Sequence, residues 1–245
     1  MIGVNITWIG HSAFLIEGYD KILVDPFLIN NPSTDVTPDQ LSCDMVCVTH
    51  GHSDHLGDAV AIAKRQKIPV LSIVELSEYF DKMKCQTVGF NIGGSVKVKD
   101  TKVTMTQAVH SSGADVDGLE GAAGAATGFV IESGGIVYHA GDTALFGDMA
   151  LIGSMHRIDV ALLPIGGFFT MDAAQAAKAV ELLKPKIAIP MHYNTWLPIK
   201  ADPSVFKRLV EKNTETKVRI LDPGQSITID TGGGRDARRP YPRRS

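Results

Sequence analysis

The chain has 245 residues, of which 44% are hydrophobic, and its formal net charge at neutral pH is −3. This length and composition suit one or two globular domains that bury a sizeable core without disulfides or other staples. A slightly acidic chain has no general attraction to nucleic-acid phosphates, and no stretch approaches eighteen consecutive apolar residues. We therefore expect no membrane contact and consider a nucleic-acid partner unfavoured.

The start of the chain and its cysteines indicate a reducing compartment. Residues 1–5 lack a basic region followed by a long apolar run, so no signal peptide is expected. Cys43, Cys47 and Cys85 form no C-x-x-C pair, and Cys47 lies between valines in an apparent strand. Buried free thiols are expected, and they suit a cytoplasmic protein.

The end of the chain differs in composition from the rest. Residues 232–245 are rich in glycine, arginine and proline, and the part 235–245 holds five arginines and one aspartate without apolar periodicity. We expect one domain over residues 1–231 and a disordered tail over 232–245. A solubilising end or a cloning remnant is favoured over a contact with nucleic acid or a membrane surface.

The first part of the chain alternates strands and helices. Alternating or continuous apolar residues indicate strands, apolar residues at helical spacing indicate helices, and residues 30–40 are rich in loop-forming types. The strands expected from these patterns are 4–9, 13–16, 21–24, 44–48 and 68–73, and the expected helices are 58–67 and 74–83.

Three further strands precede a glycine-rich loop, after which the alternation resumes. The loop, residues 113–126, is interpreted as a flap over a site, because long loops in compact domains are usually functional or disordered. The strands expected here are 86–90, 95–99, 102–108, 127–132, 136–139, 159–163, 187–189, 218–221 and 225–229, and the helices are 147–155, 173–183 and 203–212.

The strand 44–48 leads directly into His50-Gly51-His52-Ser53-Asp54-His55, which holds three of the eight histidines of the chain. Neutral imidazole is the commonest metal ligand in proteins, and aspartate adds an anionic oxygen. A strand that releases four such residues into a loop can direct them at one point. This stretch therefore predicts a metal site far more strongly than a lone histidine would.

This stretch resembles the H-x-H-x-D-H motif of the metallo-β-lactamase superfamily. Tyr138-His139-Ala140-Gly141-Asp142-Thr143 and Pro190-Met191-His192-Tyr193-Asn194-Thr195 resemble a branch of small metal-dependent hydrolases related to the ascorbate-phosphate lactonases. The likeness extends to about residue 229. It implies an α/β fold of the four-layer αββα type, with metals at one edge between two sheets.

The resemblance also implies a ligand set. His50, His52 and His110 would hold one divalent ion, Asp54, His55 and His192 a second, and Asp142 would lie between them. Asp25 matches an early aspartate that orients the metal loop in this superfamily. Such mixed imidazole and carboxylate sites suit Zn²⁺, and Fe²⁺ or Mn²⁺ remain open.

Other residues near these motifs are weaker candidates. His11 and Asn194 are considered for roles beside the ligands or the substrate, whereas His139 is interpreted as structural. Phe168 and Phe169 follow two glycines at a strand end, where they could line a substrate pocket.

The expected activity is hydrolysis of a small ester, lactone or phosphoester by a metal-bridging hydroxide, with Asp54 orienting the hydroxide. An iron-containing oxidoreductase on the same ligand set and an RNA-processing nuclease are the alternatives, and a non-catalytic metal module is disfavoured. Two β-then-α halves, about 1–125 and 126–231, are expected. The substrate, the native metal and the oligomeric state stay open.

Overall fold

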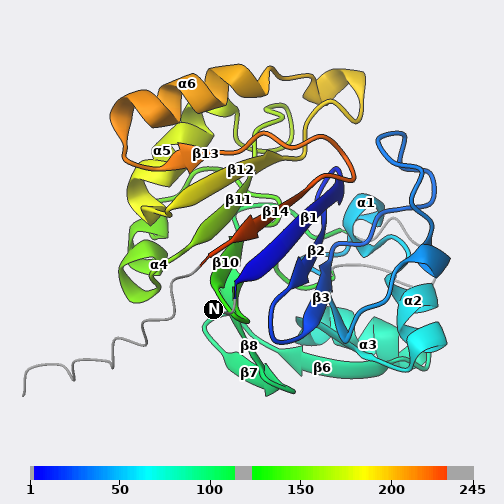
Figure 1. Ribbon diagram of the computed structural model, residues 1–245. Helices are drawn as coiled ribbons and strands as arrows, with labels where there is room; N and C mark the ends of the chain where they lie inside the picture. Colours follow the sequence, from blue (N-terminus) through cyan, green and yellow to red (C-terminus); the bar gives the residue numbers. More distant parts are fainter. Residues whose placement is uncertain (1–2, 114–122, 231–245) are drawn as a thin grey trace, which may run out of the picture.

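The computed structural model describes residues 3–113 and 123–230. In these residues two mixed seven-stranded sheets are stacked between helices on their outer sides (Figure 1). This arrangement is a four-layer αββα sandwich, which confirms the expected fold class. The expected tail 232–245 and residues 114–122 of the expected flap lie outside the described residues.

The first sheet combines the early strands of the chain with its last one. In order across the sheet, the strands are β14 (Ser226–Ile229), β1 (Val4–Gly10), β2 (Ala13–Glu17), β3 (Lys21–Val24), β4 (Met45–Cys47), β5 (Pro69–Ile73) and β6 (Gln86–Phe90). Neighbours are antiparallel from β14 to β3 and parallel from β3 to β6. Helices α2 (Ala59–Gln66) and α3 (Val74–Lys82) pack on this sheet.

The second sheet repeats this pattern of pairing. Its strands, in order, are β13 (Lys217–Val218), β12 (Ile187–Met191), β11 (Val160–Pro164), β10 (Ile136–His139), β9 (Thr127–Glu132), β8 (Thr101–Gln107) and β7 (Ser95–Val98). Neighbours are antiparallel from β7 to β10 and parallel from β10 to β13. Helices α4 (Met149–Met155), α5 (Ala173–Leu183) and α6 (Pro203–Asn213) belong to this side.

Two features differ from the sequence prediction. The chain passes from the first sheet to the second between β6 and β7, so the expected division near residue 125 is wrong. Three one-turn helices were also missed, because a single turn is too short to show a helical period. They are η1 (Pro38–Gln40), α1 (Ser53–Leu56) and η2 (Leu197–Ile199).

Apolar side chains from nearly every strand form the core, which fills the space between the two sheets and the spaces between each sheet and its helices. Phe14, Phe129 and Tyr138 are among its largest fully buried members. Cys43 and Cys47 are buried free thiols and Cys85 is partly buried, close to the expectation. No helix among the described residues is long and apolar enough to cross a bilayer.

Candidate metal centre

Strand ends from both sheets bring the predicted site residues to one edge of the sandwich. The loop after β4 carries the His50–His55 segment, and β8, β10 and β12 lead into His110, Asp142 and His192. His11 lies in the turn between β1 and β2. Ligand atoms of these residues fall into three overlapping groups in which all atoms lie within 4.8 Å of one another.

The first group consists of His50, His52 and His110. His50 Nε2 is 2.9 Å from His52 Nδ1, and the ring of His110 is 5.2 Å from each of the other two rings. Burial lowers the pKa of His50 well below its ordinary value and also lowers the pKa of His110. Both imidazoles are therefore neutral near pH 7, which is the form that binds a metal ion.

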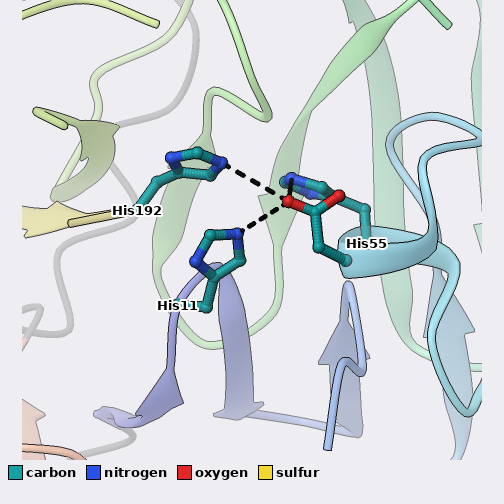
Figure 2. A group of neighbouring side chains, drawn as sticks. His11, His55 and His192 are labelled. Carbon is teal, nitrogen blue, oxygen red and sulfur yellow. Dashed lines mark hydrogen bonds and ion pairs between the residues drawn. The ribbon is translucent and has the colours of Figure 1, made fainter. Parts of the chain in front are cut away.

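The second group consists of His11, Asp54, His55 and His192. The three imidazoles converge on Asp54 Oδ2, with Nε2 distances of 3.1 Å from His11, 3.9 Å from His55 and 3.8 Å from His192 (Figure 2). Asp54, His55 and His192 were predicted as ligands of one ion. His11, a candidate for a role beside the ligands, lies in the same group.

Asp142 lies between the two groups. Its Oδ2 is 2.9 Å from His192 Nε2 and 3.6 Å from His110 Nε2, while Oδ1 is 3.3 Å from His55 Nε2. The third ligand-type group joins Asp142 with His50 and His55. One carboxylate thus faces histidines of both clusters, as a residue shared between two ions would.

The turn before Asp142 depends on glycine. Gly141 has φ of +61°, and a Cβ atom there would lie 2.4 Å from the carbonyl oxygen of Thr127. Glycine is the residue that adopts this backbone conformation without strain and fits this space. His139 supports the same turn, since its Nδ1 accepts a hydrogen bond from Gly141 N at 3.1 Å.

The charges of the centre favour cation binding. Burial alone would raise the pKa of Asp142, but His192 and His55 hold it well below its ordinary value. Burial lowers the pKa of His192, but the Asp142 carboxylate outweighs burial and raises it to about 9. Without a metal, protons on these imidazoles compensate the buried carboxylates, and a divalent cation would replace them.

Asp25 connects the metal loop to the strand before it. Its Oδ1 accepts a hydrogen bond from Thr49 N at 2.8 Å, and its Oδ2 accepts from Thr49 Oγ1 and His55 Nδ1, each at 2.7 Å. Asp25 is fully buried and has φ of +46°, a conformation that aspartate tolerates better than most residues. These contacts fix the ring of His55 so that Nε2 faces the cluster.

His11 is held from both sides of its ring. Its Nδ1 lies 2.8 Å from Thr195 Oγ1, and burial lowers its pKa to about 4, so the ring is neutral. An ionised carboxylate only accepts hydrogen bonds, so Nε2 carries the proton that faces Asp54, and Thr195 donates to Nδ1. The backbone carbonyl of His11 accepts from His192 N at 3.0 Å, which joins the two sheets at the centre.

The comparisons with known proteins agree with this geometry. The beta-lactamase superfamily domain matches residues 5–192. A metal-dependent hydrolase of Methanosarcina barkeri is 48% identical over 230 residues, covering 94% of this chain and all of that protein. A metal-dependent hydrolase of Archaeoglobus fulgidus is 49% identical over 232 residues, with 93% and 100% covered.

This chain belongs to the metallo-β-lactamase superfamily. It is an enzyme of the metal-dependent hydrolase class that these relatives represent. A solved structure, Igni18, described as a metallo hydrolase of Ignicoccus hospitalis, is 41% identical with a TM-score of 0.85, covering 93% of this chain and 99% of that one.

The donor set of this superfamily member fits metal ions on structural grounds. His55 Nε2, Asp142 Oδ1 and both ring nitrogens of His192 are buried without an aligned hydrogen bond. Buried polar atoms are rarely left without a partner, because the loss of solvation costs free energy. A cation at this edge would satisfy His55 Nε2, Asp142 Oδ1 and His192 Nε2.

The remaining candidates take supporting positions. Asn194 has φ of +59°, and its Oδ1 accepts from Ala201 N at 2.9 Å, so its side chain braces the loop after β12. His139 is fully buried, and its Nε2 lies 3.0 Å from the carbonyl of Ser12. This agrees with the structural interpretation made for His139.

Thr49 is the supporting residue that the sequence did not indicate. Its hydroxyl donates to Asp25 and also lies 3.0 Å from His50 Nδ1. A threonine at a strand end is common. The one sequence signal for a role of Thr49 is its position directly before His50, the first histidine of the motif. Ser112 is similar, because its Oγ accepts from Gly51 N at 3.2 Å.

Proposed function

We propose that this metal-dependent hydrolase cleaves a small ester, lactone or phosphoester with two divalent ions held at this edge of the sandwich. His50, His52 and His110 would hold one ion, and Asp54, His55 and His192 the other. The observation that carries the proposal is the position of Asp142, whose two oxygens face histidines of both clusters.

The donor atoms favour zinc among the divalent ions, with Fe²⁺ and Mn²⁺ compatible, because the set mixes imidazole and carboxylate and contains no thiolate. Such paired ions supply hydroxide from water near neutral pH and polarise the oxygen of the attacked group. Asp54 is the proposed catalytic residue that orients the attacking water. His11 fixes the carboxylate of Asp54 by donating to Oδ2.

The chain need not supply a serine nucleophile. Ser111 Oγ lies 3.5 Å from His52 Nε2, at the outer limit of a hydrogen bond, and Ser112 Oγ bonds to backbone atoms of Gly51 and Ala123. No G-x-S-x-G sequence surrounds either residue. These contacts support the metals as the source of the nucleophile.

An iron-containing oxidoreductase would use the same ligands, so metal analysis of protein purified without added metal is the discriminating observation. A predominance of redox-active iron would favour that alternative. The RNA-processing nuclease had only the arginine-rich tail in its support, and the tail lies outside the described residues. A small-molecule substrate and a cytoplasmic location belong to the leading proposal.

The proposal is tested by screening carboxylic esters, lactones and phosphodiesters with wild-type protein and with His52→Ala and Asp142→Ala. We expect both variants to lose most bound metal and most activity, while an exposed control, Asp39→Ala, keeps both. Full activity of either site variant with its metal content reduced would contradict the two-metal mechanism.

A further inference from the structure

Large apolar side chains are exposed around the metal edge. Phe168 is 77% exposed, Phe169 54% and Leu197 83%, and all three lie in loops that follow parallel strands of the second sheet. We define the apolar rim as these residues together with two others, Val109 after β8 and Trp196 after β12. Exposed apolar groups gathered in one place usually mark a binding surface.

Backbone contacts bring the Phe168–Phe169 turn close to the metal centre. Met171 N donates to the carbonyl of Thr143 at 3.1 Å, directly after Asp142. At the other end of the turn, a Cβ atom on Gly166 would lie 2.3 Å from the carbonyl oxygen of His192. The two phenyl rings, 4.7 Å apart, therefore project from a turn fixed at both ends beside proposed ligands.

Trp196 and Val109 are tied to the centre in the same way. The indole of Trp196 lies 4.9 Å from the ring of His11, and Val109 N donates to Thr143 Oγ1 at 3.0 Å. The Cβ of Ile199, in the η2 turn that carries Leu197, would lie 2.9 Å from a Cβ on Gly166. The loops after β11 and β12 are thus neighbours, and their apolar side chains share one area.

A hollow opens beside these residues. It has a volume of about 640 Å³ and is lined by the segment from Asn194 to Asp202, which includes Trp196 and Leu197. Pockets of roughly 300–1,000 Å³ accommodate small organic ligands. Its lining holds one cationic side chain, Lys200, and one acidic side chain, Asp202, whose charges offset each other, so the hollow is not built as an anion site.

We propose that the substrate carries a medium-length alkyl or aromatic group next to the cleaved bond, and that the apolar rim seats this group. The inference rests on the proposed function and deepens it from esters and lactones in general to apolar ones. The rim touches His11 through Trp196 and flanks Asp142 and His192, so a second copy of the chain seated there would cover the centre. A substrate side chain uses the same surface and leaves the cleaved bond at the metals.

The test measures kcat/KM for p-nitrophenyl acetate, butyrate and octanoate with metal-loaded enzyme. Burial of a methylene group is worth up to about fourfold in binding, so kcat/KM of the wild type should rise by about that factor per methylene. In the double variant Phe168→Ser, Leu197→Ser the increase should fall below about twofold per methylene, because the alkyl chain would lose apolar contact.

A matched control uses two other exposed apolar residues, which lie on α4, away from the rim. Leu151 is 59% exposed and Met155 76%, and the double variant Leu151→Ser, Met155→Ser should keep the wild-type dependence on chain length. Equal dependence in the rim variant and the wild type, with metal-dependent hydrolysis intact, would overturn the inference and leave the proposed function standing.

Binding without turnover separates the two proposals further. By calorimetry, octanoate should bind the metal-loaded protein at least tenfold more tightly than acetate, and the rim variant should lose this preference. Absence of metal-dependent hydrolysis for every ester, lactone and phosphoester would reject the proposed function alone. Equal binding of octanoate and acetate would reject the rim as the binding surface for the substrate. The same conclusion would follow if the wild type were a dimer, and the rim variant a monomer with unchanged dependence on chain length.

Discussion

At the scale of single residues, Asp25 links the fold to the chemistry. It accepts three hydrogen bonds, from two groups of Thr49 and from His55, and it is fully buried. Such supporting partners usually change metal affinity by about 10- to 100-fold when they are removed.

We expect Asp25→Ala to bind zinc about 10- to 100-fold more weakly and to lower the free energy of unfolding by roughly 3 kcal/mol, because it leaves buried donors unpaired. Competition with a chelator and urea unfolding of the metal-free protein measure the two effects. Asp39→Ala, whose side chain is 87% exposed, is the control and should change neither quantity. Wild-type zinc affinity in Asp25→Ala would show that the brace is dispensable.

His192 gives a pH dependence. Its pKa is raised to about 9 in the metal-free protein, so at pH 7 the ring carries a proton that a metal ion must displace. Zinc affinity should therefore increase as the pH rises from 7 toward 9 and then level off for this group. Calorimetry in buffers of different ionisation enthalpy should detect proton release at pH 7 that declines above pH 9. Proton release that does not depend on pH would contradict the assignment.

The sequence indicated the proposed ligands, which the structure brings together, because they form a dense motif or lie at strand ends. The resemblance implied that Asp25 orients the metal loop, and its hydrogen bonds to Thr49 and His55 support that proposal. Thr49 was not indicated by the sequence, since a hydroxyl at a strand end has many ordinary uses, and Thr195 was noted only as a neighbour of His192. Their partners, Asp25 and His11, lie far away in the chain, so only the folded structure shows what these hydroxyls hold.

At the scale of elements, periodicity predicted strands and longer helices well. The helix 173–183 was predicted with its bounds, and Asp172 caps it as expected. One-turn helices such as α1 escaped prediction because four residues show no period. This matters for the site, since α1 carries Asp54 and His55 on one turn.

The cap of α5 supports a prediction at this scale. Asp172 Oδ1 accepts from Ala174 N and Gln175 N at 2.9 and 2.8 Å, and Gln175 Oε1 accepts from Asp172 N. Asp172→Ala should lower the free energy of unfolding by about 1 kcal/mol, or the Tm by roughly 2–4 °C. Asp172→Ser retains a capping oxygen and should lose less. Calorimetry on metal-free protein measures both, and an unchanged Tm in Asp172→Ala would argue against the cap.

At the scale of the whole molecule, the two sheets are joined at both ends. Away from the candidate metal centre, Ser133 Oγ accepts a hydrogen bond from Tyr19 N at 3.0 Å and lies 2.8 Å from Thr101 Oγ1. The Thr101 hydroxyl donates its proton to Asp20 Oδ2 at 2.7 Å, so Ser133 donates to Thr101. This polar contact links the turn before β3 with strands of the second sheet. The sequence could not predict it, because the partners from different sheets lie 81 or more residues apart, whereas Ser133 and Thr101, on the same sheet, lie 32 apart.

Ser133→Ala tests whether the polar contact at one end of the sandwich affects metal binding at the other end. Loss of a buried hydroxyl that accepts from Tyr19 N and bonds to Thr101 Oγ1 should lower the free energy of unfolding by about 2 kcal/mol. Zinc content and kcat should stay at wild-type values, because the contact is at the edge opposite the candidate metal centre. Urea unfolding and metal analysis on the same sample provide both readings, and loss of metal would show that the sheet contact and the centre are coupled.

In the proposed function, two ions held on either side of Asp142 act together. The most direct measurement is activity during titration of metal-free enzyme with zinc, together with the zinc bound per chain. We predict that two zinc ions bind per chain and that full activity appears only as the second site fills. Saturation at one zinc per chain with full activity would contradict the account.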